Sequence, residues 1–524
     1  MKKFALLLAA ALLPSIMMGS EVAKGYVFDD ANGNFRKDRH EKGIAGVAVS
    51  DGRQVVTTNE KGYYEMPVND HCVIFVVKPK NYIAPVNKMG QPRSYYIHKP
   101  AGSPKDFRFK GSAPTGKLPR QLNFALQKYD DPTDFKFFIF GDPQPYSKQE
   151  MEYFRTGVVA EARKNAKGIS FGISMGDLVG DNLDLQPLYL KAISEIGLPW
   201  YNVIGNHDRN YDATDDSMSN ETFESNFGPS NYAFRYGDVH FIVLDDIMLS
   251  NPPKGNPYRG GLRDDQLQFV ENYMKLVPAD QTVMLMYHIP LVYNSRFATE
   301  ERSRLINALK GHKVFAVSAH THIQMQNFYG SEIGWEGPSP LHEYNVGTTC
   351  GDWYSGTIGS NGQPNGLMRD GTPRGYAIVT VKGGDYTVDY KVFDRPASQQ
   401  MTIYASKVIP YNNGGVYPFY VNFYTGAENS VVEYRTDGGE WKKLRRVDEP
   451  DPSYMNAVYL WDRVDHAMPG YRPRNAGFVS KHLWKGRLDE RLAPGEHRID
   501  VRATDIYGRT FTESKTFRTE SLTR

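Results

Sequence analysis

Six hydrophobic runs between residues 135 and 318 are rich in β-branched and aromatic residues, and each is followed by a polar cluster. They cover residues 135–140, 169–175, 199–204, 239–244, 283–287 and 314–318. Short uninterrupted apolar runs are typical of strands buried on both faces of an α/β sheet. Amphipathic stretches at 149–165 and 264–275 predict helices between several of these strands. The pattern therefore predicts an α/β domain in which polar residues gather where strands end.

The segments on either side show alternating strands and little helical periodicity. The strands expected before the central domain are 25–28, 47–49, 55–57, 62–65 and 121–127, and those after it are 417–424, 430–434, 498–503 and 510–517. A chain of 524 residues is also too long for one hydrophobic core. We expect a central α/β (α+β) sandwich domain at 129–395, flanked by two all-β sandwich-like domains at 21–128 and 396–524.

The first 20 residues are typical of a secretory signal peptide. Met1-Lys2-Lys3 precedes an apolar stretch that is too short to span a bilayer comfortably, and Gly19-Ser20 follows it. We expect an exported chain, secreted or periplasmic, with no transmembrane segment in the mature part. The net charge of +2 and pI near 8.2 give no specific indication of nucleic acid as a partner. Cys72 and Cys350 fall in different predicted domains, which favours two separate thiols over a disulfide.

The polar clusters after the strands combine carboxylate, amide and imidazole side chains. They contain Asp142, Gln144, Asp177, Asn206, His207, Asp208, His288, His320 and His322, whereas Asp245 and Asp246 look structural. Two divalent cations about 3.5–4 Å apart need a bridging carboxylate and a mixed set of oxygen and imidazole ligands. A single residue of these types at a strand end is usually a turn or capping residue. The set as a whole predicts a dinuclear metal site.

The order of these motifs resembles that of the calcineurin-like metallophosphoesterase superfamily. The resemblance covers about the middle half of the chain, and Gly205-Asn206-His207-Asp208 is its most specific element. It implies a first metal held by Asp142, Gln144, Asp177 and His322, and a second held by Asp177, Asn206, His288 and His320. Asp177 would then bridge the ions, and His207 would stay off them as the catalytic imidazole. The domain order also resembles a three-part subgroup of exported members.

Two positions depart from the family pattern. Gln144 stands where the family usually has His, which should weaken the first site and favour Mn²⁺ or Mg²⁺ over Zn²⁺. Family members often have a second Asp three residues after the bridging one, but here that position is Gly180. Asp181 and Asp208 are both candidates for the carboxylate that supports His207.

The predicted function is that of an exported phosphoesterase that depends on two divalent ions, with Mn, Fe, Zn and Mg all open. A hydroxide shared by the two cations would attack the phosphorus, and His207 would act as general acid. The substrate would be a small-molecule or headgroup phosphate ester, with monoester and diester both open. The alternative is a surface binding protein on an inactive phosphoesterase scaffold, suggested by Gln144 and the flanking β domains. The Gly-x-Ser-x-Gly match around Ser174 is discounted as a nucleophile elbow, because the strand continues through it.

Two further groups are candidates for binding. A long Gly-rich loop follows the last metal motif, and we expect it to rim the pocket with Trp353, Tyr354 and Arg374 as substrate contacts. The N-terminal segment has alternating oxygen ligands in a tight loop, as calcium requires, and resembles the immunoglobulin-like repeats of bacterial surface proteins. The candidate calcium ligands are Asp30, Asn32, Asn34, Asp38 and Glu41, although plain turns produce similar spacing. His342 is left open between a packing role and the site.

Overall fold

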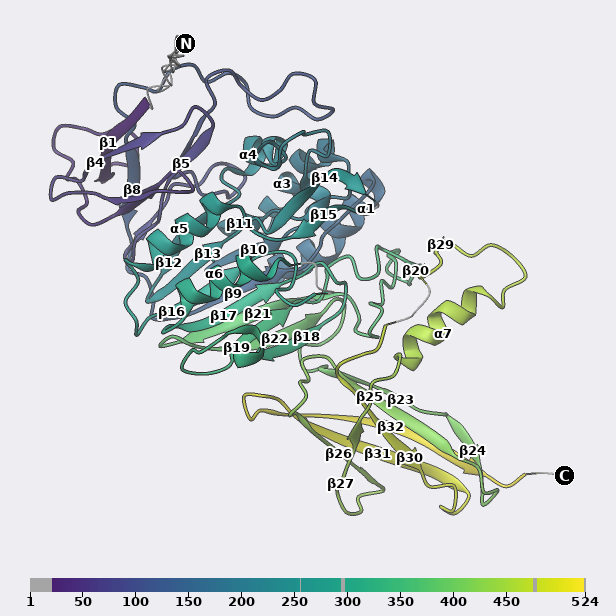
Figure 1. Cartoon of the computed structure of the whole chain (residues 1–524). Coiled ribbons are helices and arrows are strands. Elements are labelled where there is room, and N and C mark those ends of the chain that lie inside the picture. Colours follow the sequence, from purple (N-terminus) through teal and green to yellow (C-terminus); the bar gives the residue numbers. More distant parts are fainter. Residues whose placement is uncertain (1–20, 255, 294–296, 475–477, 523–524) are drawn as a thin grey trace, which may run out of the picture.

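The computed structural model describes residues 21–522 except 255, 294–296 and 475–477, so the predicted signal peptide lies outside the described residues. Three domains follow one another, with the flanking domains at opposite ends of the central one (Figure 1). Strand β8 ends at Lys128 and β9 begins at Asp134, while β22 ends at Val392 and β23 begins at Met401. No described strand therefore crosses the expected domain boundaries.

The central domain is built on two mixed sheets. The first has the order β11-β10-β9-β21-β22, from β9 (Asp134–Phe140), β10 (Phe171–Met175), β11 (Trp200–Val203), β21 (Gly375–Lys382) and β22 (Asp385–Val392). The second has the order β12-β13-β16-β17-β19-β18, from β12 (Tyr232–Tyr236), β13 (Val239–Val243), β16 (Thr282–Met286), β17 (Lys313–Ser318), β18 (Met325–Tyr329) and β19 (Leu341–Asn345). All six strands predicted from the hydrophobic runs are present, and the α/β prediction is confirmed.

The two sheets pack face to face, and helices cover their outer faces. Successive residues of a strand point to opposite faces, so Phe137 and Ile139 enter the core between the sheets while Phe138 and Phe140 pack under helices. The first sheet is covered by α1 (Lys148–Phe154), α2 (Ala160–Lys164) and α3 (Gln186–Ser194), and the second by α5 (Asp264–Met274) and α6 (Thr299–Leu309). The predicted helix at 149–165 is one helical segment with a π-helical turn at Arg155–Val159.

The carboxyl ends of the parallel strands supply the polar clusters. β9, β10 and β11 are parallel in the first sheet, as are β13, β16, β17 and β19 in the second. The antiparallel strands β21, β12 and β18 lie beside them. The loops that leave the parallel strands therefore meet at one edge of the two-sheet core.

The N-terminal domain is a small two-sheet β domain, as predicted. Its sheets have the orders β4-β1-β8-β6 and β3-β2-β5-β7, from β1 (Glu21–Asp29), β2 (Ala48–Ser50), β3 (Val55–Thr57), β4 (Tyr63–Val68), β5 (Cys72–Val76), β6 (Tyr82–Ile83), β7 (Tyr95–His98) and β8 (Phe124–Lys128). Buried ion pairs join it to the central domain: Lys99 contacts Glu221 at 2.5 Å and Glu224 at 2.6 Å, both on α4 (Glu221–Phe227). The sequence pattern missed β5, β6 and β7.

The C-terminal domain is also a two-sheet β domain. Its sheets have the orders β23-β25-β30-β28 and β24-β32-β31-β26-β27, from β23 (Met401–Tyr404), β24 (Val408–Pro410), β25 (Tyr417–Phe423), β26 (Val431–Thr436), β27 (Lys442–Lys443), β28 (Arg445–Arg446), β30 (Leu483–Leu488), β31 (Gly495–Thr504) and β32 (Thr510–Glu520). The helix α7 (Pro452–Trp461) interrupts this β domain, where the sequence pattern predicts a loop at 448–454. Asp451 caps it by accepting from the backbone N–H of Ser453 and Tyr454, and Pro452 suits its first turn.

Two short ribbons complete the strands. β14 (Ile247–Lys254) pairs with β15 (Asn256–Gly260), and β20 (Gly356–Thr357) of the central domain pairs with β29 (Gly470–Tyr471) of the C-terminal segment. No helix among those the structure describes has the length and apolar character needed to cross a membrane.

Candidate metal centre

Several candidate ligands sit where a strand turns sharply into a loop. The backbone φ is +32° at Asp142, +49° at Asp177 and +69° at His320, all in the left-handed region that L-residues rarely adopt. Gln144 and His322 share this conformation. Non-glycine residues in this region cluster at functional sites, because a strained turn can direct a side chain that a relaxed one cannot.

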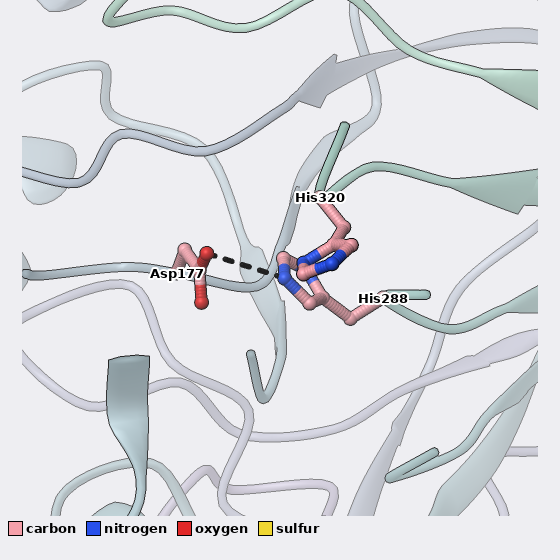
Figure 2. Close-up of side chains that lie close together, drawn as sticks. All are labelled: Asp177, His288 and His320. Atoms are coloured by element: carbon pink, nitrogen blue, oxygen red, sulfur yellow. Dashed lines mark ion pairs between the residues drawn. The ribbon is translucent and has the colours of Figure 1, made fainter. Parts of the chain in front are cut away.

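Asp177, His288 and His320 form the centre of the cluster, and their ligand atoms all lie within 4.8 Å of one another. Figure 2 shows the Asp177 carboxylate directed at His288, with Nε2 3.2 Å from Oδ2, and the His320 ring beside them. His288 Nδ1 lies 2.7 Å from the backbone oxygen of Met175, which can only accept, so this nitrogen carries the proton. In the neutral ring the Nε2 lone pair then faces the Asp177 carboxylate.

Asn206 joins this group through its side-chain oxygen. Oδ1 lies 2.9 Å from His320 Nδ1 and 3.2 Å from His288 Nε2. Lone pairs of two imidazoles, one amide oxygen and one carboxylate thus converge on one region. Such a set repels itself unless a cation or protons occupy the centre, and it matches the ligands that divalent transition metals take.

Asp142, Gln144 and His322 form a second group beside the first. Asp142 is fully buried, and its Oδ1 has no hydrogen-bond donor among the described residues. Gln144 Oε1 is likewise buried without a partner in the described part of the chain. His322 Nδ1 lies 2.9 Å from the backbone oxygen of Gly351, so a neutral ring directs its Nε2 lone pair toward Asp142 Oδ1, 3.8 Å away. Buried oxygens without donors are costly, and a bound cation removes that cost.

The electrostatics favour neutral His320 and His322 but a protonated His288. Burial lowers the pKa of His288, but the charge of Asp177 and the hydrogen bond to it outweigh burial and raise that pKa to about 10, so a bound cation would take the place of this proton. Burial lowers the pKa of His322 to about 3, and burial together with the charge of His288 lowers the pKa of His320 well below its ordinary value. Burial also raises the pKa of Asp142 well above its ordinary value. Neutral imidazole is the form that ligates metal. The seven residues predicted as ligands therefore fit a pair of divalent ions. His288 Nε2 connects the two groups, because it lies 3.2 Å from Asp177 Oδ2 and 4.0 Å from Asp142 Oδ1.

His207 lies beside this cluster and contacts Asp181. Its Nδ1 is 2.6 Å from Asp181 Oδ1, and its backbone N–H donates to Asp177 Oδ1 at 2.8 Å. Burial lowers the pKa of His207, but the charge of Asp177 and the hydrogen bond to Asp181 outweigh it, so that the pKa is raised. Of the two carboxylates left open by the sequence, Asp181 is the one that the structure places against the ring.

Asp208 has a different role. Its two carboxylate oxygens accept from the backbone N–H groups of Leu178, Val179 and Gly205, at 3.0, 3.3 and 2.9 Å. It is fully buried and ties the loop after β10 to the loop after β11. The prediction of Asp208 as a catalytic residue is therefore not supported, because its acceptor atoms are used to fix the backbone.

Tyr146 explains why a glycine stands at position 180. A Cβ added at Gly180 would lie 2.6 Å from the Tyr146 ring. The same ring makes an edge contact with His207, with centroids 5.8 Å apart. A carboxylate at 180 would displace this ring, whereas Asp181, with φ of +59°, reaches His207 from the next position. The sequence analysis did not single out Tyr146.

The three predicted substrate contacts lie in different environments. Trp353 stacks on His322, with ring centroids 4.1 Å apart, and rims the cluster as expected. Tyr354 is fully buried and donates to the backbone oxygen of Pro143, and Arg374 is buried against Phe393 and donates to Gln363. The structure gives Tyr354 and Arg374 packing roles, because the loop turns back into the core after Trp353.

Several residues near the cluster were missed. Tyr211 donates to the backbone oxygen of Asn206 at 2.6 Å, and Tyr258 and Tyr293 make edge contacts with His320. Arg369 and Arg474 both lie near the Trp353 ring. Arg369 belongs to the same Gly-rich segment as Arg374, and it is the arginine of the two that contacts Trp353. Nothing local in the sequence indicates Arg474.

The N-terminal loop is held by its own hydrogen bonds. Asp30 accepts from the backbone N–H of Asn34 and Phe35, and Asp38 accepts from the side-chain amides of Asn32 and Asn34. Glu41 accepts from the backbone N–H of Asp38. These contacts are those of a compact turn, so calcium binding stays a prediction.

Other candidates have structural partners. Ser174 is buried and accepts from Tyr189 and Trp200, unlike an exposed nucleophile. His342 on β19 bonds to Gln326 on β18 of the same sheet and to Tyr386 on β22 of the first sheet, which is a packing role. Cys72 and Cys350 are both free thiols, which agrees with the prediction from the sequence that they form no disulfide with each other.

Models of one protein family match most of the chain. Those for the N terminal of calcineurin-like phosphoesterase, for calcineurin-like phosphoesterase itself and for its C terminal match residues 30–114, 135–324 and 343–511. The chain belongs to the calcineurin-like phosphoesterases. The central match contains every candidate metal ligand of this calcineurin-like phosphoesterase, and the C-terminal match begins inside β19. The family implies binding of metal and hydrolysis of phosphate esters.

No curated protein matches the chain. Among solved structures, the purple acid phosphatase PPD1 from yellow lupin (Lupinus luteus) seeds is similar at 13% identity and a TM-score of 0.37. The match covers 73% of this chain and 68% of that one.

Proposed function

We propose that this calcineurin-like phosphoesterase hydrolyses a phosphate ester at a dinuclear centre, with His207 protonating the leaving oxygen. The observation that carries the proposal is the cluster of Asp177, His288 and His320, whose ligand atoms lie within 4.8 Å of one another, beside the buried oxygens of Asp142 and Gln144 that have no hydrogen-bond partner among the described residues. When bound, two divalent ions would supply an activated water and neutralise charge on the phosphoryl group.

The protein side chains divide the remaining work. Asp177 would bridge the two ions. Its carboxylate contacts His288 and accepts from the backbone N–H of His207, which ties the metal centre to the acid. Asp181 holds the His207 ring through Nδ1 and thereby sets its orientation. His207 can then deliver a proton to the departing oxygen, a contribution of typically 10²–10⁴ in rate.

The amide at Gln144 supports a preference for harder ions. Mn²⁺ and Mg²⁺ prefer a neutral carbonyl-type oxygen as a ligand to the imidazole nitrogen that the family usually has at this position. We also propose export to the periplasm or beyond, supported by the pattern of residues 1–20 alone.

Metal content and turnover test the proposal together. Elemental analysis of the purified protein should give two divalent ions per chain, and Mn²⁺ should stimulate hydrolysis of p-nitrophenyl phosphate, bis(p-nitrophenyl) phosphate or an alkyl phosphate. His207→Ala should leave the metal content intact and lower kcat by about 10²–10⁴. A metal-loaded protein that hydrolyses none of these esters would instead support an inactive binding scaffold. Metal content that falls in step with activity in His207→Ala would make His207 a ligand.

A further inference from the structure

The C-terminal domain places a cation beside the candidate metal centre. Trp353 stacks on His322 with ring centroids 4.1 Å apart and planes 22° apart. The guanidinium carbon of Arg474 lies 3.7 Å from the centroid of the same indole. Because the imidazole covers one face of the indole, Arg474 occupies the other face. The guanidinium is therefore no more than about 8 Å from the His322 ring, with the indole between them.

Arg369 adds a second cation to the same indole. Its guanidinium carbon lies 5.3 Å from the Trp353 ring and 3.8 Å from the Phe478 ring. One of its amino groups donates to the backbone oxygen of Thr321, between the two ligands of the last metal motif, at 2.7 Å. Its Nε is buried and has no hydrogen-bond partner among the described residues. This buried donor is available to an acceptor atom of a water or a ligand.

Positive charge exceeds negative charge around Trp353. Asp352 is the carboxylate that faces the two guanidinium groups, with Oδ1 3.9 Å from Arg369 Nε. Its other oxygen already accepts from the Tyr454 hydroxyl at 2.8 Å and from the backbone N–H of Arg474 at 3.1 Å. One carboxylate against two guanidinium groups leaves a net positive subsite next to the centre that would hold the scissile phosphate.

The position of Arg474 is fixed by the fold. β29 pairs with β20 three residues before it, and the Tyr454 hydroxyl on α7 donates to the Arg474 backbone oxygen at 2.6 Å. The Tyr454 hydroxyl has one proton, which this backbone oxygen and Asp352 Oδ2 share. The Trp353 face then orients the guanidinium itself. Both the main chain and the side chain of Arg474 are thus held toward the catalytic domain, although the residue comes from the C-terminal segment.

We propose that Arg474 and Arg369 form a subsite for a second phosphate group of the substrate, so that the preferred esters carry another phosphate a few bonds from the scissile one. The guanidinium fork binds phosphate oxygens in pairs, and the stacked arrangement reduces the ordering cost of binding. This inference rests on the proposed phosphoesterase function. It also gives the C-terminal domain a direct role in substrate selection.

Two phosphonates that cannot be hydrolysed test the subsite by calorimetry. Propylphosphonate has one anionic group, and trimethylene bisphosphonate has two groups separated by the same chain. The Mn²⁺-loaded protein should bind the bisphosphonate roughly tenfold more tightly, the range of a charge-assisted hydrogen bond. Arg474→Met keeps an unbranched stem against Trp353 but removes the charge, and should reduce this preference to twofold or less. Arg474→Lys should restore part of it.

Arg472→Met is the matched control. Arg472 is two residues away and pairs with Asp462 at 2.9 Å, so its loss should leave the preference for the bisphosphonate unchanged. Equal affinity of the wild-type protein for both phosphonates, or an equal loss for both in Arg474→Met, would overturn the subsite. Hydrolysis of p-nitrophenyl phosphate by the wild-type protein would still stand in that case, so failure of the subsite is distinguishable from failure of the proposed function.

Discussion

Asp181→Asn should slow catalysis modestly without removing metal. The carboxylate contacts His207 Nδ1 at 2.6 Å, and an asparagine oxygen can accept the same hydrogen bond. What the substitution removes is the negative charge that stabilises the protonated imidazole. The pKa of His207, which Asp177 and Asp181 together raise, should fall.

The exposure of the pair sets the size of the effect. A buried hydrogen bond to a charged group contributes about 1.5–3 kcal/mol. The Asp181 side chain is 60% exposed, however, and the His207 side chain 24%. Solvent screening at that exposure reduces the contribution to about 1 kcal/mol. The expected loss in kcat is therefore about fivefold, far below the loss expected for His207→Ala.

The assay compares an alkyl phosphate with p-nitrophenyl phosphate at saturating Mn²⁺. The loss should be larger for the alkyl ester, because an alkoxide needs a proton to leave and p-nitrophenolate needs little help. Asp184→Asn, an exposed carboxylate in the same loop, is the control and should change neither rate. A loss above a hundredfold, or a lower metal content, would refute the assignment of Asp181 as a screened positioning residue. An unchanged rate for both esters would show that His207 is positioned without it.

Three further perturbations test other parts of the structure. Asp177→Asn should abolish turnover and lower the occupancy of both ions, which elemental analysis measures, since the proposed mechanism assigns this one carboxylate to both ions; two retained metals with normal turnover would count against it. Gln144→His should tighten the first site and shift its preference toward Zn²⁺ or Fe, as metal competition can show, and an unchanged preference would remove Gln144 from the ligand set. Glu221→Gln removes one of the carboxylates that pair with the buried Lys99. The free energy of unfolding, measured by urea denaturation at neutral pH, should fall by about 3 kcal/mol. Burial raises the pKa of Glu221, but the hydrogen bond to His71 and the charge of Lys99 lower it to about 2 from an ordinary 4.5. The difference in the free energy of unfolding between wild type and this variant should therefore be largest above pH 4.5 and should shrink toward pH 2. A difference that does not change with pH would exclude the ion pair as its cause.

The sequence predicted the central domain well because its strands are buried on both faces. The run at 135–140 is apolar except for Lys136, and such a run has few alternatives to a central strand. The strand β7 was missed because its residues are only half-buried and show no clear alternation. The helix α7 was missed because its start, Asp451-Pro452, also reads as a turn, and only the capping geometry decides between them.

The candidate site also has residues that the sequence pattern predicts and residues that depend on tertiary contacts. Asp177 and His288 could be proposed as ligands because each follows a strand whose end the hydrophobic pattern predicts. The choice between Asp181 and Asp208 could not be made, because it depends on which carboxylate already accepts backbone N–H groups. Arg474 was beyond sequence reasoning, since its contact with Trp353 depends on how one domain packs on another.

The left-handed turns at the ligands have a consequence for which amino acids suit these positions. Asp142, Gln144, Asp177, His320 and His322 each hold a conformation that costs an L-residue about 1–2 kcal/mol and costs glycine almost nothing. Glycine at any of these positions would relieve the backbone strain, but it would also remove a ligand and, at Asp142 and Asp177, a carboxylate that accepts a backbone N–H. The local backbone and the metal centre therefore favour different residues at the same positions.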